Sequence, residues 1–144
     1  MSLLPPSTNA GYRGSPWSAA ALGLVGLLTL GPGLIHYALP DGGAGVIAGL
    51  DLTREGKIVV GTFAWMGALQ IPSGLLMLAI ALRYRTLVPL FLAGQLLQAA
   101  LSAVAAWIFK GTLAGHHPPE NYGVLVMLPI LALFLWLSLR NSAR

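Results

Sequence analysis

Histidine and carboxylate side chains, the groups best suited to acid–base or metal chemistry, fall in only two stretches of this chain. His36 closes the first apolar run, and Asp41, Asp51 and Glu55 lie between the first and second runs. His116, His117 and Glu120 lie between the third and fourth runs. Neutral imidazoles with carboxylates suit Zn, Cu, Ni or Fe. If the fold brings both stretches to one end, the sequence predicts a metal site of five residues: His36, Asp41, His116, His117 and Glu120.

The spacing of these groups leaves other interpretations open. His116 and His117 are adjacent, whereas metal-binding histidines on a helix are usually three or four residues apart. Histidines in a Gly-His-His-Pro-Pro loop are also typical of solvated turns, of pH-responsive loops or of a partner-docking surface. His36 could also ligate a haem or chlorin. A haem between helices usually needs a second histidine from a facing apolar run, and no other histidine lies inside a run.

A second group of polar side chains lies inside the apolar runs. Gln95, Gln98 and Ser102 fall within about 60° of one another on a helix, and Gln70 lies near the middle of the preceding run. Facing glutamines satisfy amides that are costly to leave unpaired in hydrocarbon, and such contacts commonly hold membrane helices together. The same four residues alternatively predict a polar cavity that binds a ketone, a quinone or a lipid head.

Four apolar runs must position these groups, at residues 17–39, 58–82, 87–109 and 122–139. Each is near the ~20 residues that cross a hydrocarbon core of ~30 Å. Charged residues make up only 8% of the 144 residues and hydrophobic residues 56%, so the chain cannot cover a water-exposed surface. The predicted fold is all-α, an integral membrane four-helix bundle with short loops. Its spans are expected to be kinked by proline and glycine, since each contains a proline: Pro32, Pro72, Pro89 and Pro129.

The remaining segments are short. Residues 1–16 are rich in Pro, Ser and Gly and predict a flexible tail, and residues 140–144 form a second tail after the membrane domain at 17–139. The first run is longer than the apolar region of a signal peptide, so it is predicted to be a retained span. The short link at residues 83–86 predicts that the second and third spans form a tight antiparallel hairpin and are spatial neighbours.

The distribution of Lys and Arg predicts an orientation. One side would hold Arg13, Arg83, Arg85, Arg140 and Arg144, and the other would hold Arg54, Lys57 and Lys110. Because cytoplasmic loops carry the excess of basic residues, both termini are expected in the cytoplasm, in a multi-pass protein of a cell inner membrane.

Several classes of function are disfavoured. The basic residues form no cluster that would predict nucleic-acid binding, despite a net charge of +4. Cysteine is absent, which excludes disulfides, thiolate metal sites, thiol redox chemistry and c-type haem attachment. No Asp, Glu, Lys or Arg lies in the core of a span, whereas ion-coupled transport normally needs one.

The chain resembles the small bacterial DoxX-like four-helix membrane proteins. The resemblance rests on the four spans, the Arg83-Tyr84-Arg85 turn followed by Leu87-Val88-Pro89-Leu90, and Trp107 near the end of the third span. It implies a small membrane protein of the kind that includes subunits of respiratory or sulfur redox complexes. It carries no catalytic residue over to this chain.

Two functional hypotheses follow. The first is a non-enzymatic accessory or stabilising subunit of a larger membrane assembly, for example a respiratory or redox complex. Such a subunit would contact lipid and either a protein partner or a second copy of itself. Small-residue faces such as Ala19/Gly23/Gly26 and Ala99/Ala103/Ala106 would permit close helix contacts. The alternative is a binder of, or an enzyme on, a lipophilic molecule (quinone, lipid or pigment) in the cavity of Gln70, Gln95, Gln98 and Ser102. No particular cofactor is indicated.

Overall fold

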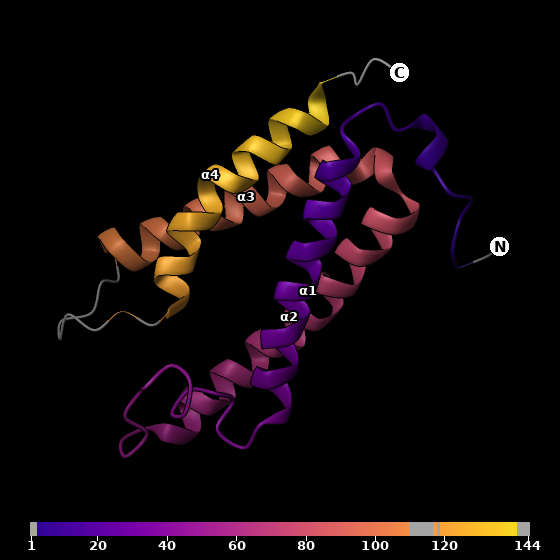
Figure 1. Ribbon diagram of the computed structural model, residues 1–144. Coiled ribbons are helices and arrows are strands. Elements are labelled where there is room, and N and C mark those ends of the chain that lie inside the picture. The colour runs from indigo at the N-terminus through magenta and orange to yellow at the C-terminus, as the bar shows by residue number, and fades with distance from the viewer. Residues whose placement is uncertain (1–2, 110–116, 118, 141–144) are drawn as a thin grey trace.

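The computed structural model describes residues 3–109, 117 and 119–140. They form four helices long and apolar enough to cross a membrane, packed as a bundle (Figure 1). The helices are α1 (Pro16–Ala38), α2 (Gly56–Arg83), α3 (Val88–Val104) and α4 (Pro119–Leu139), and a π-helical turn (Ala105–Phe109) extends α3. The all-α, four-span fold predicted from the sequence is therefore confirmed.

Local chemistry explains the ends and the continuity of these helices. α1 begins at Pro16 because the hydroxyl of Ser15 accepts a hydrogen bond from the Trp17 amide, and proline is favoured in a first turn. Pro32 lies inside α1, and the helix continues through it to Ala38. α2 and α4 likewise continue through their interior prolines, Pro72 and Pro129.

Helices α1 and α2 form a closely packed antiparallel pair. Two glycines on each helix, seven residues apart, face the partner helix: Gly26 and Gly33 on α1, and Gly67 and Gly74 on α2. A Cβ atom built on Gly74 would lie 2.8 Å from the Gly26 carbonyl oxygen, and one on Gly67 would lie 2.6 Å from the Gly33 carbonyl oxygen. These glycines let the two backbones approach one another directly.

Helix α3 packs mainly against α4 and contacts α2 only sparsely. The sequence correctly predicted a short α2–α3 connection, which consists of Tyr84 and the 3₁₀ turn Arg85–Leu87. The prediction that these two helices are close neighbours along their length is wrong. Helix α2 packs instead on the glycine face of α1, so the bundle consists of two pairs, α1–α2 and α3–α4 (Figure 1).

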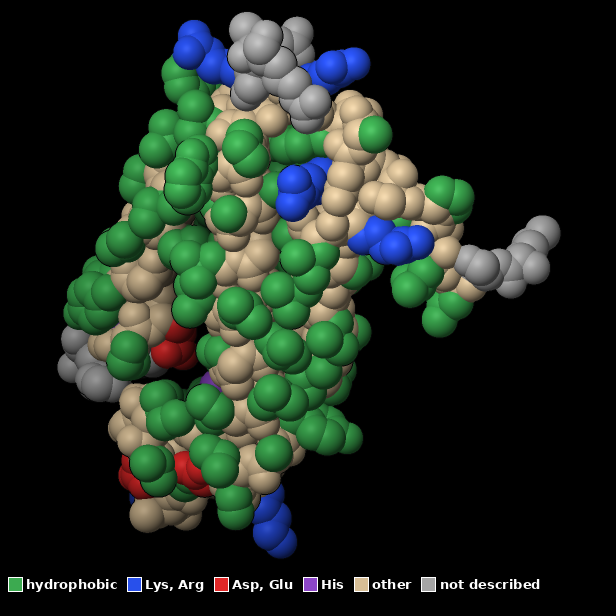
Figure 2. Space-filling model, turned by 45° about the vertical axis from the view of Figure 1, so that its right-hand side comes forward, with side chains coloured by type: hydrophobic (Ala, Val, Ile, Leu, Met, Phe, Trp, Pro, Cys, Tyr) green, Lys and Arg blue, Asp and Glu red, His purple; other side chains and the backbone are tan. Residues whose placement is uncertain are grey.

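The two pairs converge at the end that carries both chain termini (Figure 1). There the fully buried Ser18 of α1 donates its hydroxyl hydrogen to the Phe134 carbonyl oxygen of α4, at 2.8 Å. Buried apolar side chains from all four helices pack together: Leu22, Met77, Ile80, Val88, Leu92 and Leu131. Toward the opposite end the two pairs diverge (Figure 1), and the space-filling view shows a hollow between them, which we call the wedge (Figure 2).

The N-terminal segment covers the α2–α3 connection. Asn9 donates to the Leu82 carbonyl oxygen at 2.7 Å and accepts from the Arg85 amide at 3.2 Å, while the Thr8 amide donates to the Arg83 carbonyl oxygen at 3.0 Å. These bonds satisfy backbone groups that a helix end leaves unpaired. Part of the predicted flexible tail thus makes specific contacts, and its mobility stays a prediction to be measured.

Candidate functional site

A cavity of about 320 Å³ occupies the wedge between the helix pairs. Its polar lining comes from three helices: Thr29 of α1, Gln95, Gln98 and Ser102 of α3, and Glu120 of α4. The rest is apolar, consisting of Val25, Leu28, Ala99, Gly123, Val124, Met127 and Leu131. The polar stripe predicted on the third span therefore faces the space between the helix pairs.

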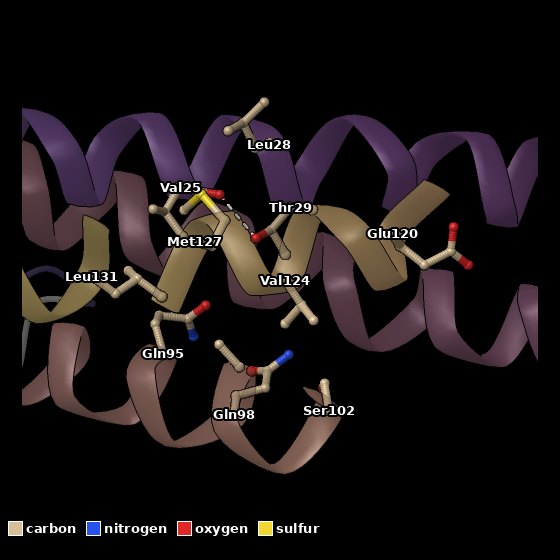
Figure 3. A pocket seen from close by; sticks show the side chains of 12 residues that line it. Val25, Leu28, Thr29, Gln95, Gln98, Ser102, Glu120, Val124, Met127 and Leu131 are labelled. Atoms are coloured by element: carbon tan, nitrogen blue, oxygen red, sulfur yellow. Dashed lines mark hydrogen bonds between the residues drawn. The ribbon is translucent and has the colours of Figure 1, made fainter. Parts of the chain in front are cut away.

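Figure 3 shows how these side chains lie. Gln95 and Gln98 point from α3 toward α1 and α4, and Thr29 points down from α1 toward them. The Thr29 hydroxyl donates to the Val25 carbonyl oxygen of its own helix at 2.9 Å, so its oxygen keeps its accepting capacity for another group. Glu120 lies at one end of the cavity, exposed, with its carboxylate directed away from the other labelled side chains.

A second cavity of about 340 Å³ adjoins the first and shares Thr29, Gln95 and Gln98 with it. Its other lining residues are Leu69, Gln70, Ser73 and Met77. The Oε1 atom of Gln70 is buried and has no hydrogen-bond partner. If Gln70 and Gln98 were paired, the Gln98 amide would donate a hydrogen bond to this oxygen. No such bond is present at Gln70 Oε1. The residues lie around a shared space instead.

Four of the polar residues that line these cavities were singled out from the sequence, and two were not; their role in binding stays a prediction. Gln70, Gln95, Gln98 and Ser102 line the two adjoining cavities as a set. Thr29 was missed because a threonine in a membrane helix usually bonds its own backbone, as Thr29 also does. Glu120 was assigned to the metal hypothesis because only the path of α4 shows that its first turn borders the cavity.

The His36 and Asp41 side chains contact the backbone of the loop that follows α1. His36 Nδ1 lies 2.7 Å from the Gly42 carbonyl oxygen, and the ring packs edge-on against Phe63 with centroids 5.0 Å apart. The Asp41 carboxylate accepts hydrogen bonds from the amides of Gly43, Gly45 and Val46, at 2.9–3.2 Å. The bonds from Val46 and Gly43 lower the pKa of this carboxyl below its usual value.

His117 belongs to an aromatic cluster at the start of α4. Its ring stacks on Trp107, with centroids 4.2 Å apart and an interplanar angle of 19°, and Tyr122 packs edge-on against Trp107. The Asn121 amide nitrogen lies 3.4 Å from His117 Nδ1, and the Trp107 indole donates to the Asn121 carbonyl oxygen at 3.1 Å. The π-helical turn that extends α3 carries Trp107 in this cluster.

The metal hypothesis is not tested by this geometry. His116, one of its five residues, lies outside the described part of the chain. Among residues 3–109, 117 and 119–140, no group of three or more histidine or carboxylate side chains is arranged to hold a metal. In the space-filling view, acidic and histidine side chains border a hollow between the helix pairs. Further acidic side chains lie near the bottom of the view, and Lys and Arg side chains lie at both ends, with more of them at the top (Figure 2).

Comparison with protein-family models, curated proteins and solved structures finds no match for this chain. The resemblance to DoxX-like proteins therefore finds no support in these comparisons. The fold and the four spans define the class, a small integral membrane protein.

Proposed function

We propose that this small four-span membrane protein binds a lipophilic molecule with a polar head in the wedge between its helix pairs. The observation that carries the proposal is the convergence of Thr29, Gln95, Gln98 and Ser102 on one cavity inside an otherwise apolar bundle. Polar side chains at membrane depth are unfavourable unless they find a partner. A ligand with a polar head would be such a partner.

The dimensions fit this class of ligand. The two adjoining cavities measure about 320 and 340 Å³, and small-molecule sites are typically ~300–1,000 Å³, mostly apolar with a few convergent polar groups. The unpartnered Gln70 Oε1 and the Thr29 hydroxyl oxygen both offer hydrogen-bond acceptance. These atoms favour a head that donates at least one hydrogen bond, as a hydroxyl or amide does.

The accessory-subunit hypothesis is retained as the second candidate. One of its arguments was the small-residue face of Ala19, Gly23 and Gly26, which would let helices approach closely within the bundle or with a partner. Gly26 packs against α2, where an added Cβ would meet the Gly74 carbonyl oxygen at 3.0 Å. That glycine therefore makes a contact within the bundle, and the cavity is the separate observation that favours ligand binding. The proposed orientation has both termini in the cytoplasm. It is supported by Arg13 before α1, Arg83 and Arg85 around the α2–α3 connection, and Arg140 after α4.

Mild-detergent purification followed by mass spectrometry of bound small molecules tests the proposal. We expect a lipophilic compound to be retained by the wild type and reduced in Thr29→Val and Gln98→Leu. Thr62→Val is the matched control, because Thr62 also donates to a carbonyl four residues earlier at 2.9 Å but is exposed and lines neither cavity.

Three outcomes separate the hypotheses. Retention that is lost in Thr29→Val and kept in Thr62→Val supports the wedge as the binding site. Equal retention in all variants, or no retained compound in the wild type, contradicts the proposal. Stoichiometric co-purifying subunits without a small molecule would favour the accessory role.

A further inference from the structure

A separate apolar groove runs along the outside of the α1–α2 pair, away from the wedge. Its volume is about 420 Å³, and it shares no lining residue with the two wedge cavities. Small side chains form its floor, at Ala19, Ala20, Gly23 and Ala81, and leucines form its walls, at Leu24, Leu27, Leu78 and Leu82. Among the residues that the structure describes, Arg85 is the only charged one that lines it.

The groove has the length of one membrane leaflet. It extends along α1 from Pro16 to Leu27, which at ~1.5 Å per residue is about 16 Å. Half of a hydrocarbon core is about 15 Å. Arg85 begins the 3₁₀ turn that follows α2 and Tyr84, and it lies at the end where α1 begins. Trp17, 73% exposed in the first turn of α1, is typical of the headgroup level.

Arg85 is held in place by a hydrogen bond from its guanidinium. Its Nε donates to the Ala81 carbonyl oxygen at 3.0 Å, which fixes the guanidinium beside the groove. Neighbouring arginines at this end are engaged differently: Arg83 donates to the Pro5 carbonyl oxygen, and Arg140 stacks over the Trp136 ring at 3.9 Å. Asp41, Asp51 and Glu55 lie between α1 and α2, and Glu120 lies in the first turn of α4. These positions are at the end of the bundle opposite the α2–α3 connection, which carries Arg85.

We propose that this groove binds an anionic phospholipid of the membrane, with one acyl chain along α1–α2 and the phosphate at the Arg85 guanidinium. A guanidinium binds phosphate oxygens in a bidentate manner. The small floor residues let an acyl chain lie between the leucine walls. The site is distinct from the wedge and does not depend on the ligand proposed there.

Native mass spectrometry of the full chain in detergent tests the site with two lipids that share their oleoyl chains, phosphatidylglycerol and phosphatidylcholine. We expect the wild type to retain phosphatidylglycerol preferentially. Arg85→Gln should weaken this retention about fivefold, the change that corresponds to ~1 kcal/mol per basic residue at an anionic surface. Arg85→Lys should keep most of the preference, because the charge remains.

Arg13→Gln is the matched control, because it removes one positive charge from the same end and does not line the groove. Equal losses in Arg85→Gln and Arg13→Gln, or equal retention of the two lipids by the wild type, overturn the proposal. Gly23→Leu tests the acyl-chain part, because a leucine there fills the floor, and it should lower retention of both lipids. Displacement of phosphatidylglycerol by inorganic phosphate alone would contradict a site that recognises the chain.

Discussion

The close glycine contact between α1 and α2 makes Gly67→Ala a sharp test of the fold. A Cβ at residue 67 would lie 2.6 Å from the Gly33 carbonyl oxygen and 2.8 Å from the Tyr37 amide nitrogen. Both are backbone atoms, so no side-chain rotation relieves the contact. Ordinary contact begins at 3.4 Å, so α1 must move away from α2 by about 0.8 Å at this level.

Gly61→Ala is the matched control on the same helix, since an added Cβ there meets no atom within 4 Å. Both substitutions gain the same ~1 kcal/mol of helix propensity, so the difference between them isolates the contact. Overpacking a closely packed site costs ~1–3 kcal/mol. Gly67→Ala should therefore be less stable than Gly61→Ala by about 1–3 kcal/mol.

The measurement is reversible unfolding of purified protein in mixed detergent micelles, followed by circular dichroism as the denaturing detergent fraction rises. Gly61→Ala should unfold at or above the wild-type midpoint, and Gly67→Ala below it. If both variants unfold together, the two backbones do not approach as closely as the glycine contacts require, and the paired arrangement of the helices is refuted.

Three further predictions concern single features. Asp41→Asn should speed amide hydrogen exchange in the loop after α1, because an amide group that donates replaces one of the accepting carboxylate oxygens. Asp51→Asn is the control. It disturbs one backbone hydrogen bond, so it should speed exchange only near residue 53. The pKa of Asp41 is lowered in the fold. The carboxylate therefore stabilises the loop above the usual aspartate pKa, and this stabilisation is lost as pH falls through the lowered value. Loop protection that is unchanged in acid would contradict this. Ser18→Ala should cost about 0.6–2 kcal/mol in the same unfolding assay by removing an interhelical bond, and Ser73→Ala, whose hydroxyl bonds its own helix, should cost less. A cysteine at Val46, which is 87% exposed, should react with an impermeant thiol reagent from the side opposite both termini; labelling from the same side as a tagged N-terminus would overturn the orientation.

The helices were predictable from the sequence because each span is a long apolar run that must satisfy its backbone internally in lipid. The polar stripe was predictable too, since Gln95, Gln98 and Ser102 share a face by spacing alone. The pairing of helices was not. A short connection between the second and third spans suggested neighbours, but the decisive signal was the heptad spacing of glycines at Gly67 and Gly74, opposite Gly26 and Gly33.

The position of Glu120 was unpredictable for a similar reason. Its distance along the chain from Thr29 and Gln98 gave no sign that α4 would bring it to the same cavity. The contacts of Asn9 with the α2–α3 connection were also hidden, because a Pro- and Ser-rich composition describes the average behaviour of a segment and not the hydrogen bonds of one side chain.

The same glycines that join α1 to α2 also account for the wedge. Once α2 packs on the glycine face of α1, α3 is left to pack on α4, and the two pairs meet mainly at one end. Polar groups can then remain where the pairs diverge, which is where Gln70 Oε1 has no partner. A loosened α1–α2 pair should therefore disturb the cavity as well as the stability. Loss of a retained lipophilic compound in Gly67→Ala, but not in Gly61→Ala, would show that helix pairing and the binding site depend on the same contact.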